Sequence, residues 1–190
     1  MKNNGKIFKK RIIVFGFEGK NNKTETNYFS HFLPIDEKYI LKPISAGVTD
    51  LEGMIKSIKD KRKNYDYDSK IDLTYIFVDD DCSKEKRERI EALKKTLPKD
   101  ITIIRSSPMF ELWFLNHFCK TTKGYLTNDD LINDLKKFIP EYEKNLDCFD
   151  RIKDLTTIAL ANTNYQIKQG NKCTSTDVGE IIDKLLKFKN

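Results

Sequence analysis

Four short apolar segments alternate with amphipathic segments between residues 11 and 107, and this order constrains the fold more than any other feature. The first segment, RIIVFGFE, is a continuous run rich in β-branched residues, which is typical of a strand buried on both faces of a parallel sheet. Strands of this length that alternate with helices predict an α/β domain with right-handed crossovers. The expected strands are residues 11–18, 38–44, 72–81 and 101–107.

The segments between these strands have the apolar spacing of helices. Thr49 or Asp50 is the expected cap of one helix, and Ser83 of another. Beyond about residue 120 the strand pattern stops and helical periodicity continues to the end. We therefore predict a parallel four-stranded sheet flanked by helices in residues 1–120, with a helical C-terminal extension, 121–190, packed on it as part of one structural unit. The expected helices are residues 24–33, 48–65, 82–97, 109–118, 127–139, 141–168 and 176–188.

The net charge of +6 and the pI near 9.0 are compatible with a polyanionic partner such as nucleic acid. Basic residues concentrate in residues 56–65 and 84–89, and either run alone can equally be a solvated helix face. The cysteines at 82, 119, 148 and 173 have no metal-site spacing, so we expect reduced thiols in a cytoplasmic protein. The N-terminal apolar run is too short for a signal sequence or a membrane span.

Acidic residues stand at the ends of the expected strands, where open parallel sheets bind their ligands. Glu18 closes the first strand, residues 79–81 (DDD) close the third, and Glu111 follows the fourth. Because side chains alternate along an extended chain, Asp79 and Asp81 should face one side and Asp80 the other. Two such carboxylates can share a divalent cation, which prefers oxygen ligands. The alternative is that the triplet only caps the following helix.

Other common catalytic motifs are missing. The sequence contains no Walker A loop, no Rossmann glycine fingerprint and no G-x-S-x-G elbow. His31 and His117 lie in aromatic helical segments, where structural roles are the simpler interpretation. These absences leave acid-plus-magnesium chemistry, in which a metal neutralises charge on a phosphate and a carboxylate handles a proton.

Three motifs resemble the Toprim fold and, more closely, its RloB-like members, which are found beside restriction and phage-defence genes. FEGKNNKTETNYF resembles the pattern E-G-x-x-T-E-x-x-Y-F, and IFVDDDC resembles a strand that ends in D-x-D. SSPMFELWFLNHF resembles P-x-F-E-L-W-x-x-x-H-F and is the most specific of the three. The chain departs from the family by a longer spacing before Thr24-Glu25 and by Ser107 in place of a common Asn.

The resemblance implies a role for each acid. Glu18 matches the acid proposed to transfer a proton, and Asp79 and Asp81 match the Mg²⁺-binding pair. Glu25 and Glu111 are further candidate ligands, although Glu25 is also explained as a first-turn helix acid and Glu111 as the partner of a nearby Lys or Arg. The aromatic residues around Glu111, which are Phe110, Trp113 and Phe114, are better explained as core than as base-stacking platforms.

The resulting hypothesis is a Toprim-type nuclease that uses Mg²⁺ or Mn²⁺ to cleave DNA or RNA, tRNA included, in prokaryotic antiviral defence. The alternative is a non-catalytic accessory subunit that binds nucleic acid or another protein of a defence or restriction system. Topoisomerase or primase chemistry has little support, because no tyrosine context for a covalent DNA link is evident. Phosphate contacts are expected from basic residues near the acids, namely Lys20, Lys23, Lys84, Lys86, Arg87 and Arg105.

Overall fold

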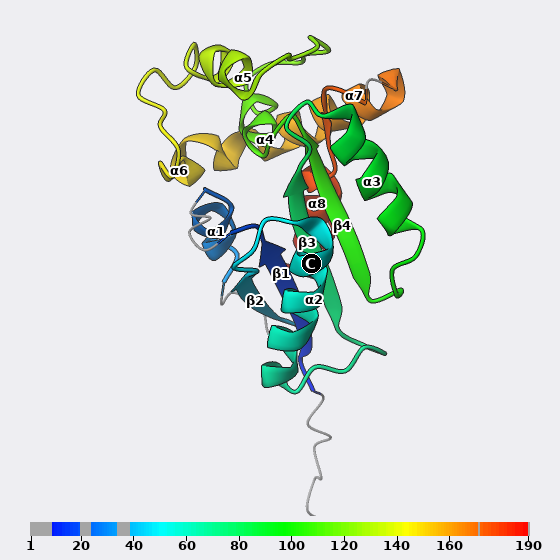
Figure 1. Cartoon of the computed structure of the whole chain (residues 1–190). Helices are drawn as coiled ribbons and strands as arrows, with labels where there is room; N and C mark the ends of the chain where they lie inside the picture. The colour runs from blue at the N-terminus through cyan, green and yellow to red at the C-terminus, as the bar shows by residue number, and fades with distance from the viewer. Residues whose placement is uncertain (1–8, 20–23, 34–38, 171, 190) are drawn as a thin grey trace, which may run out of the picture.

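A computed structural model of the chain describes residues 9–19, 24–33, 39–170 and 172–189. Its centre is a five-stranded sheet in the order β2-β1-β3-β4-β5 (Figure 1). The first four strands are parallel, and β5 pairs antiparallel with β4 at the edge of the sheet. The strands are β1 (Arg11–Phe17), β2 (Tyr39–Ser45), β3 (Leu73–Asp79), β4 (Ile101–Ser107) and β5 (Ser175–Thr176).

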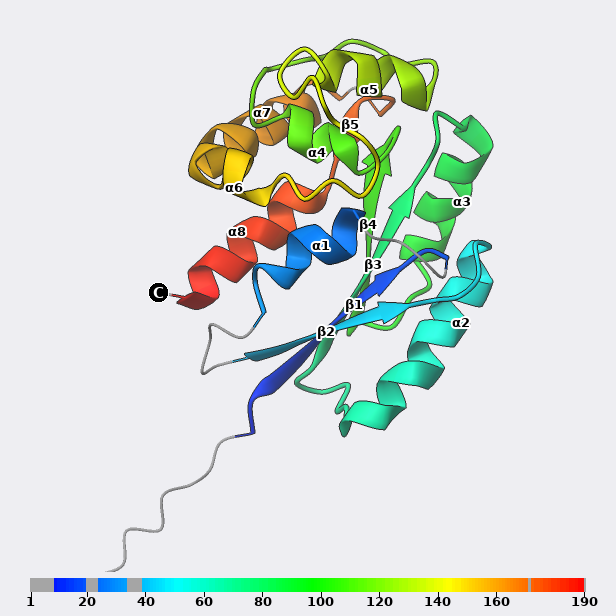
Figure 2. The ribbon, with the colours of Figure 1, turned by 90° about the vertical axis from the view of Figure 1, so that its left-hand side faces the viewer.

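Helices cover both faces of the sheet, as expected of an α/β domain. Helices α2 and α3 lie on one face, and α1 and α8 lie on the other (Figure 2). A separate group of helices packs at the end of the sheet where the parallel strands finish. The helical elements are α1 (Thr24–Ser30), α2 (Leu51–Arg62), η1 (Lys63–Tyr65), α3 (Lys84–Lys94), α4 (Glu111–Leu115), α5 (Asn128–Leu135), α6 (Phe149–Ile152), η2 (Lys153–Leu155), α7 (Thr156–Gln169) and α8 (Val178–Lys189).

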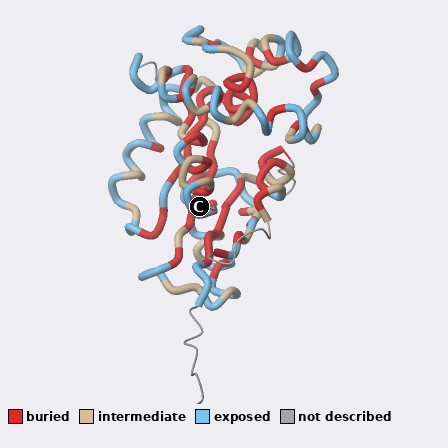
Figure 3. Tube along the Cα trace, turned by 180° about the vertical axis from the view of Figure 1, so that it is seen from behind, coloured by how far each residue is buried: buried red, intermediate tan, exposed pale blue. Residues whose placement is uncertain are grey.

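The two faces of β1 contribute to different hydrophobic cores. Ile13 and Phe15 belong to the larger core, beneath the aromatic residues of α1 and α4, whereas Ile12 and Val14 belong to the smaller core beneath α2 and α3. Alternation of side chains along the strand produces this division. Buried residues accordingly run along the strands and the inward sides of the helices (Figure 3).

Gly16 allows α2 to approach β1 closely. A Cβ atom at this position would collide with the side chain of Ile58, which is fully buried. The apolar run of β1 therefore contains a glycine where the helix crosses it.

The structure confirms an α/β fold with a mostly parallel sheet, and it adds a fifth strand to the four predicted. The helix predicted for residues 176–188 begins at Val178, and residues 175–176 pair with Ser107 and Ser106 instead. A pairing of two residues gives no period-2 pattern that a sequence could reveal. Because β5 and α8 complete the sheet and its larger core, the C-terminal segment is more than a helical cover.

The prediction of a helix from residue 141 to 168 is wrong in its first part. Residues 141–148 form turns, and helical structure begins at Phe149. Asn145 has a left-handed φ of 77°, and its backbone N–H donates to the Thr24 hydroxyl at 3.2 Å. This contact with α1 replaces the backbone hydrogen bonds that a helix would need.

Two of the general predictions also have structural outcomes. The four cysteines all lie in the described residues, and none of them forms a disulfide. None of the helices in the described part of the chain has the length and apolar character needed to cross a lipid bilayer.

Candidate functional site

The end of β1 is held in place by the loop between β2 and α2. The Gly19 N–H donates to the Val48 carbonyl at 3.0 Å, and the Gly47 N–H donates to the Gly19 carbonyl at 3.0 Å. Gly19 has a φ of 67°, a left-handed conformation that glycine adopts without steric cost. The chain therefore turns sharply just after Glu18, which is half-buried at the carboxyl end of the sheet.

The end of β3 is fixed in a similar way by β4. The Asp80 N–H donates to the Ser106 carbonyl at 3.0 Å, and the Asp81 N–H donates to the Pro108 carbonyl at 2.9 Å. Asp81 and Cys82 both have positive φ angles, 51° and 61°. Two consecutive non-glycine residues in this region cost free energy, and such conformations concentrate at functional sites.

All five predicted acids line one cavity of about 360 Å³: Glu18, Glu25, Asp79, Asp81 and Glu111. The cavity lies where β1 and β3 end and where α1 and α4 begin (Figure 1). Three segments that are distant in sequence thus bring carboxylates to one point, as the convergence of parallel strand ends predicts. Their roles in metal binding and catalysis stay predictions.

The carboxylates differ in how they are paired. Asp81 accepts hydrogen bonds from Lys86 Nζ at 2.7 Å and from Asn128 Nδ2 at 3.1 Å, so both of its oxygens are engaged. Asp79, in contrast, makes no hydrogen bond or ion pair through its carboxylate with any residue the structure describes. The Asp79 carboxylate therefore has no direct partner among the described residues.

Burial raises the pKa values of three of the acids, Asp79, Glu18 and Glu111. The pKa of Asp79 is raised well above its usual value by burial and then by the charges of Glu25, Glu111 and Asp81, which Lys86 only partly offsets. Burial also raises the pKa of Glu18, again against the opposing effect of Lys86. The cavity thus favours protons, or another source of positive charge, over bare carboxylates.

Glu111 is buried, and its carboxylate has a hydrogen-bond donor. It accepts a hydrogen bond from the Tyr142 hydroxyl at 2.8 Å. Burial raises the pKa of Glu111, and this hydrogen bond lowers it in part. The expected partner of Glu111 was a local Lys or Arg, whereas in the structure a tyrosine hydroxyl donates to it.

The segment 141–148 contributes site residues that the sequence did not indicate. Lys144 and Asn145 line the same cavity, and Tyr142 is fully buried beside it. The helical periodicity of this segment concealed a loop. Pro140 lies just before the predicted helix and is compatible with a helix start, so it did not reveal the loop.

The donor atoms suit a divalent cation, although their positions are not those of a finished site. Carboxylate oxygens are the ligands that Mg²⁺ prefers, and Asp79, Glu25 and Glu111 present them in a buried cluster whose repulsion a cation would relieve. Among the described residues, however, no three His, Cys, Asp or Glu side chains are grouped closely enough to hold a metal. Binding would therefore require the carboxylates to move closer together.

Asp80 faces away from the cavity, as strand alternation predicts, and holds two arginines. Its Oδ2 accepts from Arg87 Nε and from Arg105 Nη1, both at 2.9 Å, and its Oδ1 accepts from the Ser107 hydroxyl at 2.9 Å. Arg105 also donates to the Lys172 carbonyl at 2.9 Å. The Asp80 side chain is completely buried.

Two of the residues predicted to contact phosphate belong to this cluster. The Arg105 side chain is only 8% exposed and that of Arg87 only 12%, and both are ion-paired with Asp80. Because breaking a buried ion pair is costly, these arginines stabilise the fold. Sequence reasoning missed this because the buried partner, Asp80, was interpreted only through its neighbours. Their contacts with a phosphate stay predictions.

The remaining basic candidates have different outcomes. Lys86 lies at the cavity through its ion pair with Asp81. Lys84 is exposed at the start of α3 and lies 3.7 Å from Glu88. Lys20 and Lys23 lie outside the described residues. Of the predicted phosphate-binding residues, Lys86 is thus the one that the structure places beside the acids.

The histidines and aromatic residues have structural positions. His117 is buried, and its Nδ1–H donates to the Trp113 carbonyl at 2.8 Å. His31 stacks on Phe149 with a centroid distance of 4.1 Å and lies 2.8 Å from Asp147. Phe110, Trp113 and Phe114 are all core residues, which confirms their interpretation as packing groups.

Comparison with known protein families matches residues 12–185 to the family described as RloB-like protein. The match covers both the strands that carry the acids and the C-terminal loop and helices that close over them. No curated protein and no solved structure matches the chain.

Proposed function

The chain belongs to the RloB-like protein family, and from this premise we propose that it is a metal-dependent nuclease of the Toprim superfamily. The proposed reaction is Mg²⁺- or Mn²⁺-dependent cleavage of phosphodiester bonds in DNA or RNA, as part of prokaryotic antiviral defence. The observation that carries the proposal is the convergence of five carboxylates on one cavity at the carboxyl end of the sheet.

The acids divide into two roles in this proposal. Asp79, Glu25 and Glu111, which are nearest to being a buried cluster of oxygen donors, would hold the cation, together with Asp81 once Lys86 releases it. When bound, the cation supplies positive charge next to the scissile phosphate. Glu18 is partly exposed, and burial raises its pKa, so it is suited to take or give a proton.

Two lysines on different elements are suited to orient the substrate. Lys86 comes from α3, and Lys144 comes from the loop over the cavity. Each can contact a phosphate oxygen as a point charge while the carboxylates keep to the cation. Such contacts would position the backbone without selecting a base sequence.

A cleavage assay tests the proposal. The protein is incubated with plasmid, single-stranded DNA and total RNA, in Mg²⁺ or Mn²⁺ and in EDTA. We expect cleavage of at least one substrate, its loss in EDTA, and a decrease of about 100-fold or more for Asp79→Asn. Asp154→Asn, at an exposed aspartate outside the cavity, is the matched control and should keep full activity. Equal cleavage in EDTA would contradict the proposal.

A non-catalytic binding subunit is the second candidate, and one observation favours it. Lys86 and Asn128 occupy both oxygens of Asp81, an arrangement that also serves a stable, unreactive structure. Isothermal titration distinguishes the two functions. Tight binding of nucleic acid without turnover, in every divalent cation tried, would favour the binding subunit.

A further inference from the structure

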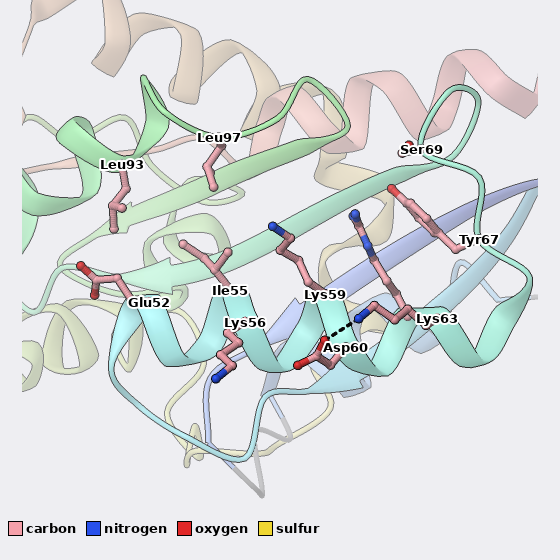
Figure 4. A pocket seen from close by; sticks show the side chains of 11 residues that line it. Glu52, Ile55, Lys56, Lys59, Asp60, Lys63, Tyr67, Ser69, Leu93 and Leu97 are labelled. Carbon is pink, nitrogen blue, oxygen red and sulfur yellow. Dashed lines mark hydrogen bonds and ion pairs between the residues drawn. The ribbon is translucent and has the colours of Figure 1, made fainter.

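A second cavity, unrelated to the acids, lies between α2 and α3 on the opposite face of the sheet. It has a volume of about 600 Å³ and is called here the α2–α3 groove. Its floor is formed by Ile55, Leu93 and Leu97, and Tyr67 lines its far end (Figure 4). Leu93 and Leu97 are only half-buried, so apolar surface is left accessible along the groove.

The side of the groove formed by α2 carries an excess of positive charge. Lys56, Lys59 and Lys63 recur at helical spacing and line it. Lys63 is paired with Asp60 at 2.8 Å, whereas Lys56 and Lys59 form no ion pair with a described residue. The hydrogen bond and charge of Lys63, followed by the charges of Lys56 and Lys59, lower the pKa of Asp60. The lysines thus dominate the local potential.

Both ends of the groove are fixed by ion pairs. Arg89 of α3 is paired with Glu52 of α2 where the groove begins. At the other end Arg62 is held by Asp100 at 2.8 Å and stacks on the Tyr67 ring at 4.1 Å. These contacts set the position of the walls before a ligand arrives, which lowers the entropic cost of binding.

The shape and chemistry of the groove select a particular kind of partner. The lining residues of α2 and the start of η1 run from Glu52 to Lys63, about three helical turns or roughly 17 Å. An aliphatic floor beside a row of lysines matches a helix with apolar residues on one side and acidic residues on its flank. A nucleic-acid strand would use the lysines but not the leucines, and Arg62 already occupies one face of Tyr67.

We propose that the α2–α3 groove binds an acidic amphipathic helix of a partner protein. The apolar side chains of that helix contact Ile55, Leu93 and Leu97, and its acidic side chains pair with Lys56 and Lys59. In Figure 4 the Lys59 side chain extends from α2 toward the α3 side of the groove, beside Ile55. The groove and the acidic cavity are lined by different residues, so the two sites can be tested separately.

A peptide selection on the whole chain tests the inference. A displayed library of helix-forming peptides of about four turns is selected against the protein, and the enriched peptides are synthesised with a fluorescent label. Their affinities are measured by fluorescence anisotropy for wild type and for the double variant Lys56→Glu/Lys59→Glu. The matched control reverses two exposed lysines elsewhere, Lys136→Glu/Lys168→Glu, and circular dichroism verifies that each variant is folded.

We expect the enriched peptides to be acidic and amphipathic. Their affinity should fall by about ten-fold or more in the groove variant and stay unchanged in the control. Failure to enrich such peptides would overturn the inference, as would peptide affinities that are the same in both variants. If the groove variant instead weakens binding of single-stranded RNA or DNA oligonucleotides while no peptide depends on it, the groove is a nucleic-acid surface and the inference is wrong.

Discussion

Asp79 and Asp80 are adjacent in the chain, yet their carboxylates lie on opposite sides of β3. Asp79 lines the acidic cavity, where Glu25, Glu111 and Asp81 repel it, and Asp80 is buried between Arg87 and Arg105. Neighbouring residues of one type are therefore in opposite electrostatic environments. Substitutions at the two positions should change the free energy of unfolding in opposite directions.

Replacement of Asp79 by asparagine should stabilise the protein when no divalent cation is present. A carboxyl group whose pKa is raised by folding favours the folded state below its unfolded pKa, and this contribution is lost as the pH rises through the folded pKa. At pH 7 folding must either bury the Asp79 charge or take up a proton, and Asp79→Asn removes this cost. Urea unfolding in EDTA at pH 7 measures the effect, and an Asp79→Asn protein less stable than wild type would contradict the account.

Replacement of Asp80 by alanine should destabilise the protein by roughly 3 to 5 kcal/mol. The substitution leaves Arg87 and Arg105 without their shared carboxylate in a buried environment. The same urea experiment measures the loss. Replacement of an exposed aspartate, Asp154→Ala, serves as the control and should change stability little. An Asp80→Ala protein as stable as wild type would mean that the two arginines find other partners.

Mg²⁺ should raise the thermal stability of the wild-type protein and not that of Asp79→Asn. A ligand that binds only the folded state stabilises it by about 2.7 kcal/mol at roughly 100 times its Kd. Calorimetric scans at increasing Mg²⁺, with ionic strength held constant by KCl, give the shift in Tm. Equal shifts in both proteins would place the cation somewhere other than the acidic cavity.

Replacement of Tyr142 by phenylalanine should cost about 1 to 3 kcal/mol. The variant keeps the ring in the core but leaves buried Glu111 without its hydroxyl donor. The pKa of Glu111, which this hydrogen bond lowers, should rise further. Chemical unfolding gives the stability change, and hydrogen exchange of residues 141–148 reports whether the loop opens more readily. Unchanged exchange there would show that the Asn145 contacts hold the loop alone.

Acidification should destabilise the protein through His117. Burial lowers the pKa of His117 from 6.5 to about 4, so the unfolded chain takes up the proton first. The resulting contribution is present above about pH 6.5, declines as the pH falls and amounts to roughly 3 kcal/mol when fully lost. The raised pKa values of Glu18 and Asp79 act in the opposite direction, because a carboxyl group with a raised pKa favours the folded state more as the pH falls.

The difference between wild type and His117→Asn isolates the histidine. It should change with pH between about 4 and 6.5 and be constant above that range. Urea unfolding at a series of pH values provides the measurement. If the difference in unfolding free energy does not change with pH, burial does not lower the pKa of His117.

The sequence was sufficient to predict where the acids converge, because strand ends of a parallel sheet are a matter of topology. Apolar runs located β1, β3 and β4, and the residues that follow them were bound to meet at one edge. The direction of Asp80 also followed from alternation. Alternation could not predict which residue pairs with Asp80 on the other side of the sheet. Arg105 appears in the sequence as one basic residue among many, and only the folded chain shows it buried against Asp80.

The helix predicted for residues 141–148 was wrong for a different reason. Residues 141–148 have apolar spacing compatible with a helix, but the backbone N–H and C=O of Asn145 bond to α1, more than 100 residues earlier. Local propensity is a weak guide when tertiary contacts take over the backbone groups. The pair of residues 175–176 is similar, since its only strand-like property is its partner, β4.

The hydrogen bond between Asn145 and Thr24 determines when, during translation, the acidic cavity can be completed. All five carboxylates have been translated once the ribosome reaches residue 111. Asn145, which binds Thr24 and Asn27, follows these two residues by 121 and 118 positions. A growing polypeptide therefore possesses the acids well before it possesses the loop that encloses them. If the protein is the proposed nuclease and harms its own cell, nascent chains on the ribosome lack the loop that lines the acidic cavity. Activity would then require the last quarter of the sequence.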